Sequence, residues 1–242
     1  MILILTMAGK YTRFSEFSYE IPKYLLPVAN RTLLHCVIKE FDTAGIFDEI
    51  ILIANKRDKR FRSQIESTVN EFKFKNKSLH FIEDTPGQAT TAYIGTEKIN
   101  PVDLNTKPIV IHNIDTILLN REFSKLNSFF ESNDCFIDVF SSRNNDYSYV
   151  LKSRGRITFI SEKETISSMA SSGCYGFKNG KMLQDYLKKS KCEYISDVIN
   201  DMIQSNLTVD NLCVYSEMDT IVMGTPNEYI SNAPIFSTLR GE

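Results

Sequence analysis

The chain has 242 residues, of which 28 are basic and 30 acidic, and its formal net charge is −2. Because this balance leaves no strongly basic surface, we expect no DNA, RNA or anionic membrane partner. No apolar run approaches the roughly 20 residues of a membrane span, and the first apolar run follows Met1 directly, so a signal peptide has no room and we expect a cytoplasmic protein.

Apolar runs alternate with amphipathic segments over the first part of the chain. We expect strands at residues 2–5, 49–54, 79–83, 108–112 and 135–141, and helices at residues 32–44, 59–72, 87–99 and 123–130. This alternation is typical of an α/β fold with a mostly parallel sheet covered by helices on both faces. No Pro-, Gly- or Ser-rich linker interrupts the pattern, so a single domain over residues 1–242 is predicted.

The rest of the chain has a different pattern. Residues 149–152 and 156–160 predict a hairpin, residues 173–177 a further strand, and residues 182–188 and 195–204 two helices. In open α/β sheets, ligands bind outside the carboxyl ends of the strands. The loops after the first, third and fourth expected strands are therefore the candidates for a functional site.

The first of these loops combines small residues with cations. Ala8 and Gly9 follow the strand, Arg13 comes next, and Lys23 lies about ten residues later. Glycine lets the backbone approach a ligand closely, and Arg and Lys place positive charge against a polyanion. The segment has the elements of a triphosphate-binding loop, although a strand followed by a glycine turn occurs in any α/β protein.

Polar residues follow the third and fourth expected strands. Gln88 lies in a Pro-Gly turn that opens a helix, and Asp115 ends the segment Asn-Ile-Asp. A carboxylate at the end of a buried strand suits Mg²⁺, which prefers oxygen ligands and keeps much of its water shell. The alternative is structural, with Gln88 at an ordinary helix start and Asp115 as a cap or turn residue.

Taken in order, these segments resemble the sugar-nucleotidyltransferase (nucleoside-triphosphate transferase) family along most of the chain. The family opens with a strand, an A-x-G-x-G-[ST]-R-[LF] loop and then P-K-x-L-L-P-[VI], which Pro-Lys-Tyr-Leu-Leu-Pro-Val at residues 22–28 matches. Tyr11 stands where the family has its second loop glycine. The resemblance implies a Rossmann-like three-layer fold with a mostly parallel mixed sheet and a small β-hairpin region on the acceptor side. It also implies nucleotide binding by Ala8, Gly9, Tyr11, Thr12 and Gln88, catalysis by Arg13 and Lys23, and a Mg²⁺ cofactor on Asp115.

The second half resembles the acceptor-binding half of the same family. Tyr-Ser-Tyr-Val at residues 147–150, Glu162-Lys163 and Gly173 follow the order of Y-G-V-V, E-K-P and A-G-I-Y-x-F. The resemblance implies that Lys163 binds the acceptor's phosphate, that Glu162 bonds to its body, and that Gly173 belongs to the same pocket. Ser148 replaces a family glycine and Glu164 a family proline, which favours an acceptor other than an ordinary hexose phosphate.

The last motif bears on the metal. Many relatives have D-x-G-T-P, with the aspartate as second metal ligand, but here Val222 occupies that position before Gly224-Thr225-Pro226. Asp219, in Glu-Met-Asp-Thr at residues 217–220, instead resembles the E-I-D-T ending of phosphocholine-type cytidylyltransferases. The second metal ligand is therefore expected to be Asp219 or to be absent.

The resemblance is nearest to short bacterial cytidylyltransferase-like members of surface-polysaccharide pathways. It implies transfer of a nucleoside monophosphate, CMP being favoured, from a triphosphate to a phosphorylated acceptor, with release of pyrophosphate. The acceptor would be a sugar 1-phosphate, phosphocholine, phosphoglutamine or a similar molecule, and the product a precursor for capsule or other surface polysaccharide. A homo-oligomer is compatible with the family, which forms monomers, dimers and tetramers.

Two other functions stay open. A non-catalytic, nucleotide-sensing or regulatory relative of the same fold is suggested by Tyr11 and by the unsettled second metal ligand. A glycosyltransferase of the GT-A-like type would also hold a metal on a Rossmann-like sheet, but Gly9, Arg13 and Lys23 have no task in that chemistry.

Overall fold

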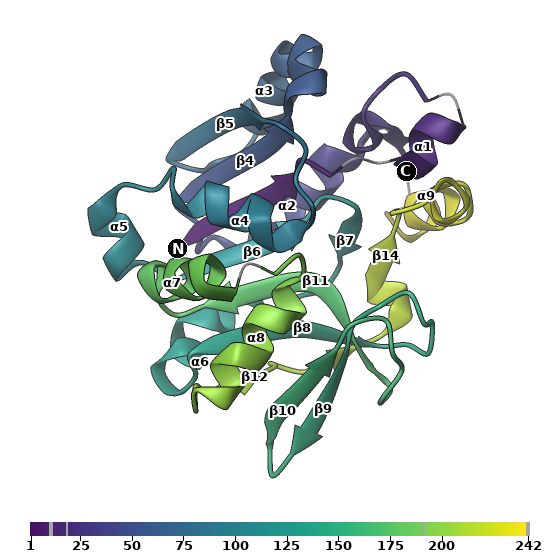
Figure 1. Ribbon diagram of the computed structural model, residues 1–242. Helices are drawn as coiled ribbons and strands as arrows, with labels where there is room; N and C mark the ends of the chain where they lie inside the picture. Colours follow the sequence, from purple (N-terminus) through teal and green to yellow (C-terminus); the bar gives the residue numbers. More distant parts are fainter. Residues whose placement is uncertain (10–11, 18, 191, 241–242) are drawn as a thin grey trace.

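A mixed sheet forms the centre of the molecule. The computed structural model describes residues 1–9, 12–17, 19–190 and 192–240. Over this part of the chain the strands follow the order β10-β9-β11-β6-β1-β4-β5, with β8 beside β11 (Figure 1). The parallel strands are β1 (Ile2–Met7), β4 (Glu49–Asn55), β5 (Asn76–Ile82) and β6 (Ile109–Asn113). β11 (Met169–Phe177) runs antiparallel to both β6 and β8 (Cys135–Ser141).

Strand β1 connects two hydrophobic cores. Ile2 and Ile4 belong to one core and Leu3 and Leu5 to the other, because side chains alternate between the faces of a strand. All four are fully buried, and burial of each contributes about 1.5–3 kcal/mol. The first core is covered by α4 (Gln88–Thr96), α5 (Pro101–Thr106), α7 (Gly180–Ser190) and α8 (Ile195–Gln204). The second is covered by α2 (Leu33–Ala44), α3 (Arg62–Asn70) and α6 (Leu126–Ser132).

Local signals set the ends of several helices. At the start of α2, the Thr32 side chain accepts a hydrogen bond from the backbone N–H of His35, and Gly45 ends the helix in the left-handed conformation with φ +68°. At α5, Asn100 accepts from the N–H of Asp103, and Pro101 occupies the first turn, where no backbone donor is needed. These helices therefore begin and end where their sequences favour it.

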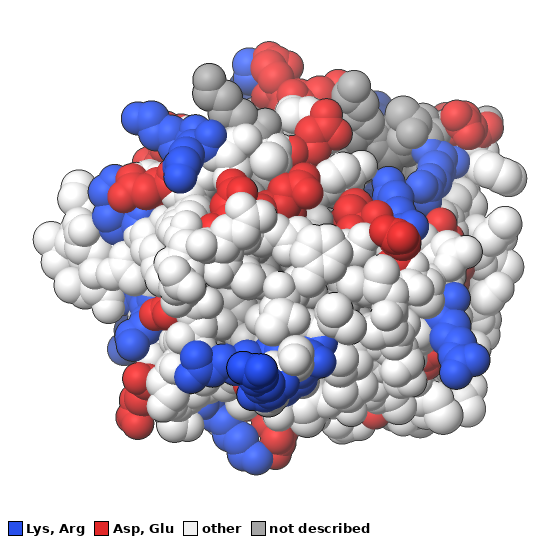
Figure 2. All heavy atoms as spheres, turned by 60° about the horizontal axis from the view of Figure 1, so that its bottom comes forward, with Lys and Arg blue, Asp and Glu red and all other residues white. Residues whose placement is uncertain are grey.

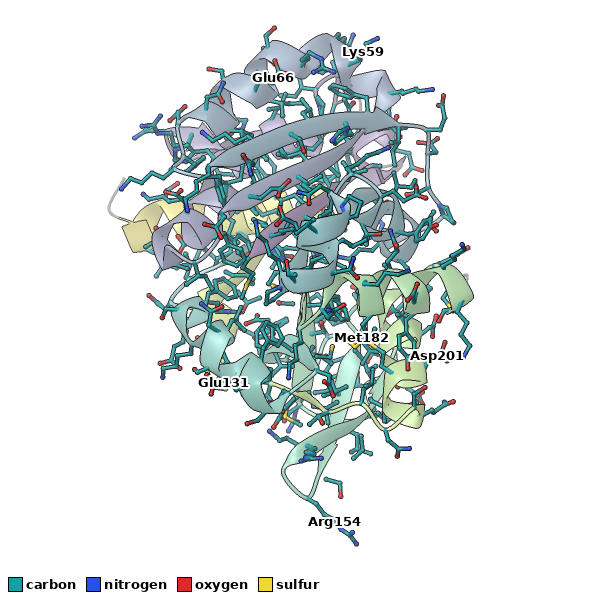
Figure 3. The ribbon with its side chains drawn as sticks, turned by 90° about the vertical axis from the view of Figure 1, so that its left-hand side faces the viewer. Lys59, Glu66, Glu131, Arg154, Met182 and Asp201 are labelled. Carbon is teal, nitrogen blue, oxygen red and sulfur yellow. The ribbon has the colours of Figure 1, made fainter. Side chains whose placement is uncertain are left out.

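The hairpin predicted near residue 155 projects from the body (Figure 1). It consists of β9 (Tyr149–Ser153) and β10 (Arg156–Ser161). Arg154 and Gly155 both have positive φ angles, +50° and +80°, as the commonest two-residue hairpin turn requires. Arg154 lies at the tip and points away from the molecule (Figure 3).

Shorter elements complete the described chain. The paired strands are β2 (Pro27–Val28) with β3 (Arg31–Thr32), β7 (Thr116–Leu118) with β14 (Thr220–Val222), and β12 (Val209–Asp210) and β13 (Val214–Tyr215) with β8. The remaining helices are α1 (Thr12–Glu16), α9 (Pro226–Arg240), η1 (Lys23–Leu25), η2 (Lys56–Phe61), η3 (Phe123–Lys125) and η4 (Glu217–Asp219).

The predicted α/β class, with a mostly parallel central sheet and a small antiparallel hairpin, is confirmed. Each strand and helix expected from the sequence is present, with ends that differ by a few residues. The helix expected over residues 59–72 is a 3₁₀ segment followed by α3. The β7–β14 ribbon was not predicted, because its strands have three residues each and pair across about a hundred positions. Helices α5 and α9 were not predicted either.

The surface carries charges of both signs. In the view of Figure 2, basic and acidic side chains are interspersed around a largely uncharged middle.

Among the described residues, no helix combines the length and apolar character that crossing a membrane requires.

A buried ion pair joins the β7–β14 ribbon to the central sheet. The guanidinium of Arg121 lies 3.0 Å from Asp138 of β8, and their side chains are 1% and 0% exposed. Arg121 also donates to the carbonyls of Leu119 at 3.0 Å and Asp219 at 2.6 Å, and to the Thr220 hydroxyl at 2.6 Å. One side chain therefore holds the end of β7, the start of β14 and the middle of β8 together.

Replacing Arg121 by alanine is expected to lower the free energy of unfolding by about 3–5 kcal/mol, because Asp138 would stay buried without its cationic partner. Urea denaturation at neutral pH measures this. The matched control is Lys181→Ala, which removes the exposed pair with Asp185 and should change stability by about 1 kcal/mol or less. Equal effects of the two substitutions would contradict the anchoring role of Arg121.

Candidate functional site

Two adjoining pockets open at the carboxyl ends of β1 and β6. The loop pocket is lined by Thr6–Gly9 at the end of β1, Lys23, residues 85–88, Thr91 and residues 113–115. The hairpin pocket lies on the side of β9–β10 and is lined mainly by Arg13, Tyr147, Ser148, Glu162, residues 171–173, Tyr194, Val222, Gly224 and Glu228. Both pockets include Gln88, Asn113 and Asp115. These three residues therefore form the boundary at which two ligands could meet.

Lys23 and Asp115 form an ion pair at this boundary. The Lys23 Nζ atom lies 2.5 Å from Asp115 Oδ2, and the side chains are 14% and 20% exposed. Helix η1 carries Lys23, and Asp115 follows β6, so the tertiary fold brings the two together. Burial raises the pKa of Asp115, but the charge and hydrogen bond of Lys23 outweigh it and hold the pKa below its ordinary value. Asp115 is therefore ionised at neutral pH.

The start of the loop after β1 is held by an unpredicted polar network. Asn55 donates to the Ala8 carbonyl at 3.2 Å, and Arg57 donates to the Gly9 carbonyl at 2.9 Å. The same two side chains bind Asp84 at 2.6 and 2.7 Å. Among the described residues, nothing lies within 4 Å of the point that a Cβ on Gly9 would occupy, so these residues leave the backbone open to a ligand there.

The remaining candidates from this loop are distributed unevenly. Arg13, on α1, is exposed and lines the hairpin pocket rather than the loop pocket. Tyr11 lies outside the described residues, and of Thr12 only the backbone, at the start of α1, is described. The roles proposed for Tyr11 and for the Thr12 side chain stay predictions.

Gln88, Gly173 and Asn113 meet between the two pockets. Gln88 Nε2 donates to the Gly173 carbonyl at 3.2 Å. Gly173 has φ +80°, and a Cβ there would lie 2.4 Å from Asn113 Nδ2, so both the backbone conformation and the space require glycine. The buried Oδ1 of Asn113 has no hydrogen-bond partner within the described part of the chain. Its capacity to accept a hydrogen bond or to bind a cation is therefore unused among these residues.

The structure brings Glu162 to the hairpin pocket and leaves Lys163 beside it. Glu162 Oε2 accepts hydrogen bonds from the hydroxyls of Ser148 and Ser196, the latter at 3.0 Å. Ser148, which departs from the family pattern, therefore orients Glu162, a residue predicted to bind the acceptor. Lys163 Nζ lies 3.3 Å from the Tyr194 hydroxyl, and Tyr194 lines the pocket. Glu164 is turned to Ser161, whose hydroxyl donates to it at 3.1 Å.

Asp219 is not brought to Asp115. Met223 N–H donates to the Asp115 carbonyl at 2.7 Å, whereas Leu119 N–H donates to the Asp219 carbonyl at 2.9 Å. The two acids thus lie at opposite ends of the β7–β14 ribbon, about 13 Å apart for four residues of strand. The carboxylate of Asp219 accepts from Asn120 at 2.7 Å and from Ser216 at 2.6 Å. Its expected role as a metal ligand with Asp115 has no geometric support.

Other residues of the hairpin pocket were not predicted. Asp146, Glu228 and Tyr194 line it, and so does Ser172, a residue that is 4% exposed and whose hydroxyl has no hydrogen-bond partner within the described residues. These residues come from separate loops and helices, so no local sequence signal could have grouped them. Among the described residues, no group of three or more His, Cys, Asp or Glu side chains could hold a metal.

Comparison with known proteins places these observations in a family context. Residues 2–232 match the family model described as nucleotidyl transferase. Comparison with curated proteins gave no match.

Solved structures of similar fold cover nearly the whole chain. A nucleoside-diphosphate-sugar pyrophosphorylase from Vibrio cholerae RC9 superimposes with a TM-score of 0.84 at 23% identity, over 97% of this chain and 100% of its own. A UTP-bound UGPase from Acinetobacter baumannii gives 0.76 at 18% identity, over 98% and 93%. A UDP-glucose pyrophosphorylase complexed with UDP-glucose gives 0.77 at 15% identity, over 99% and 98%. At these identities the likeness shows a shared fold.

Replacing Lys23 by methionine is expected to raise the pKa of Asp115 above its ordinary value of 3.8, because burial then acts without the cation. In the native protein the pair stabilises the fold above the unfolded pKa, and this contribution is lost as the pH falls through the lowered folded pKa. Carboxyl ¹³C NMR titration of both proteins measures the shift. An Asp115 pKa that is the same with and without Lys23 would contradict the assigned cause.

Proposed function

This chain belongs to the nucleotidyl transferase family, and from that premise we propose that it transfers a nucleoside monophosphate from a nucleoside triphosphate to a phosphorylated acceptor, releasing pyrophosphate. The observation that carries the proposal is the Lys23–Asp115 pair, at the boundary between a loop pocket and a separate hairpin pocket. A two-substrate reaction at phosphorus needs such a meeting point. In this proposal the triphosphate occupies the loop pocket and the acceptor the hairpin pocket.

The proposed reaction needs no general acid or base from the protein. A phosphate oxygen of the acceptor is already ionised near neutral pH, so it can attack the α-phosphorus without a general base. What the site must supply is alignment and neutralisation of charge. In this proposal Lys23 stabilises the α-phosphate and the attacking oxygen, and Arg13, which lines the hairpin pocket, stabilises charge on phosphate oxygens.

The residues at the boundary fit a Mg²⁺ ion. Asp115 offers an ionised carboxylate, and the orphaned Oδ1 of Asn113 is a second oxygen in the same pocket wall. Mg²⁺ is bound in such enzymes by one or two carboxylates together with phosphate oxygens. When bound, the ion would neutralise charge on the triphosphate. Lys23 would then exchange Asp115 for phosphate as its partner.

The donor is proposed to be CTP. The support is the resemblance of Glu-Met-Asp-Thr at residues 217–220 to cytidylyltransferase endings. UTP is the alternative, because one structural neighbour is UTP-bound.

The hairpin pocket favours an acceptor with a hydrogen-bond-donating or cationic body. Asp146, Glu162 and Glu228 bring carboxylates to it, and Tyr147 and Tyr194 bring aromatic rings. Burial, and then the negative charges of Glu228 and Glu217, raise the pKa of Tyr147 to about 12. Hydroxyls of a sugar 1-phosphate suit these carboxylates, and a quaternary ammonium such as that of phosphocholine suits both carboxylates and rings. The product would be a precursor for surface polysaccharide.

A nucleotide-sensing role is the second candidate. It is favoured by Val222, which stands where many relatives have a metal-binding aspartate, and by the distance of Asp219 from Asp115. A sensor would bind a triphosphate in the loop pocket and release no pyrophosphate.

Pyrophosphate release distinguishes the transferase from the nucleotide sensor. We would supply CTP, UTP, dTTP, GTP and ATP with Mg²⁺ to the purified chain, each against sugar 1-phosphates, phosphocholine and phosphorylated amino-acid derivatives. Release with one pair identifies donor and acceptor together. Triphosphate binding without release from any pair would favour the sensor.

The variant Lys23→Ala is expected to lower kcat by about 10²–10³-fold, because removal of one preorganised charge at a developing oxyanion has effects of this size. Turnover is measured with the pair found above, and circular dichroism shows whether the fold is kept. A folded Lys23→Ala protein with native turnover would contradict the proposed mechanism.

The variant Lys163→Met should raise the KM for the acceptor about tenfold and leave triphosphate affinity unchanged, because Lys163 lies beside the hairpin pocket only. The control is Lys181→Met on the exposed face of α7, which should alter neither constant. An effect confined to triphosphate affinity would assign Lys163 to the other substrate.

A further inference from the structure

A second carboxylate lies beside Asp115, and it comes from helix α9. The point that a Cβ on Gly224 would occupy is 3.2 Å from Asp115 Oδ2 and 3.4 Å from Glu228 Oε2. Both oxygens therefore border the small space that a side chain at Gly224 would fill. Both residues line the hairpin pocket, and Asp115 also lines the loop pocket.

Gly224 is needed here for space. It does not have a positive φ angle, so its backbone conformation is open to any residue. A side chain at this position would project into the gap between the carboxylates. The glycine thus keeps open a space bounded by two oxygen ligands and adjoining the pocket assigned to the triphosphate.

The position of Glu228 is fixed by the first turn of α9. Its backbone N–H donates to the Thr225 hydroxyl at 3.2 Å, and Tyr229 binds the Pro27 carbonyl through its own hydroxyl at 2.6 Å. Asn232 donates to the Val222 carbonyl at 2.7 Å, which ties the helix to β14. The first part of α9 is therefore held by hydrogen bonds to Pro27 and to Val222, and these bonds fix the position of Glu228 relative to Gly224.

Among the described side chains, no cation is paired with the Glu228 carboxylate. Within the described residues it takes part in no hydrogen bond or ion pair, whereas Asp115 is paired with Lys23. A divalent cation bound between the two carboxylates would be held by an oxygen from each of them. Val222 lines the same pocket but carries no ligand atom.

We propose that Glu228, across Gly224 from Asp115, is the second carboxylate ligand of the divalent cation at this site. The inference rests on the proposed function, since that function supplies the triphosphate whose oxygens would complete the coordination. It assigns to a helix residue the task that the sequence motif assigned to Asp219.

Metal binding tests the inference independently of turnover. Mn²⁺, a paramagnetic substitute for Mg²⁺, is titrated into the full chain and followed by electron paramagnetic resonance, alone and with α,β-methylene-CTP. Glu228→Gln should weaken Mn²⁺ binding about tenfold or more, by comparison with losses on altering metal-site residues. Asp115→Asn should weaken it likewise. Asp219→Asn is the matched control and should leave the affinity unchanged.

Gly224→Ala provides a second variant that keeps both carboxylates. Its methyl group would enter the gap, so it too should weaken Mn²⁺ binding while circular dichroism and the thermal midpoint show a folded protein. Glu228→Gln keeps the backbone bond to Thr225, so a fall in stability with unchanged Mn²⁺ affinity would reduce Glu228 to a helix-cap residue and overturn the inference.

The remaining outcomes separate the two proposals. Loss of Mn²⁺ affinity in Asp219→Asn but not in Glu228→Gln would overturn the inference and restore Asp219. No Mn²⁺ binding by the native chain under either condition would also overturn it. If pyrophosphate is released but Glu228→Gln binds Mn²⁺ as tightly as the native chain, the inference fails and the proposed function stands. If Mn²⁺ binding depends on Glu228 but no substrate pair gives pyrophosphate, the metal site is supported and the proposed transferase function fails.

Discussion

The arrangement of the site depends on the buried pair of Arg121 and Asp138. Asp115 and Gly224 lie on segments separated by more than a hundred residues of sequence, and the ribbon of β7 and β14 is what brings them together. Strands of three residues are too short to hold such a contact by their own hydrogen bonds. Arg121 connects both strands of the ribbon to β8 through a charged side chain that is almost completely buried. The geometry around Asp115 therefore depends on an ion pair whose residues line neither pocket.

The two pockets differ in the charge they present. The loop pocket contains exposed backbone at Gly9 and the cation Lys23, which suit a triphosphate. The hairpin pocket contains carboxylates, tyrosines and the cation Arg13. Lys23 and Asp115 neutralise each other where the pockets meet. A bound polyanion could pair with Lys23 and its metal ion with Asp115. Neither buried charge would then be left without a partner when the ion pair opens.

Local sequence signals were sufficient for most of the framework and part of the site. The apolar runs of β1, β4 and β6 and the amphipathic stretch of α2 are visible without tertiary information, because burial on one or both faces imposes their periodicity. Short motifs pointed to Lys23 and Asp115, which the fold brings together as an ion pair, while their catalytic and metal-binding roles stay predictions. Asp219 could not be placed correctly, because a motif gives the order of residues and not the end of a ribbon at which each lies.

The sequence by itself determined the alternation of strands and helices, the small-residue turn after β1 and the acid after β6, since each depends on neighbouring residues only. The tertiary structure alone decided that Ser148 orients Glu162, that Asn55 and Arg57 hold the first loop, and that Glu228 and Asp115 border the same space beside Gly224. These contacts join residues far apart in the chain or on unrelated elements. They arise from how the β7–β14 ribbon, the hairpin and α9 pack, which no local periodicity encodes.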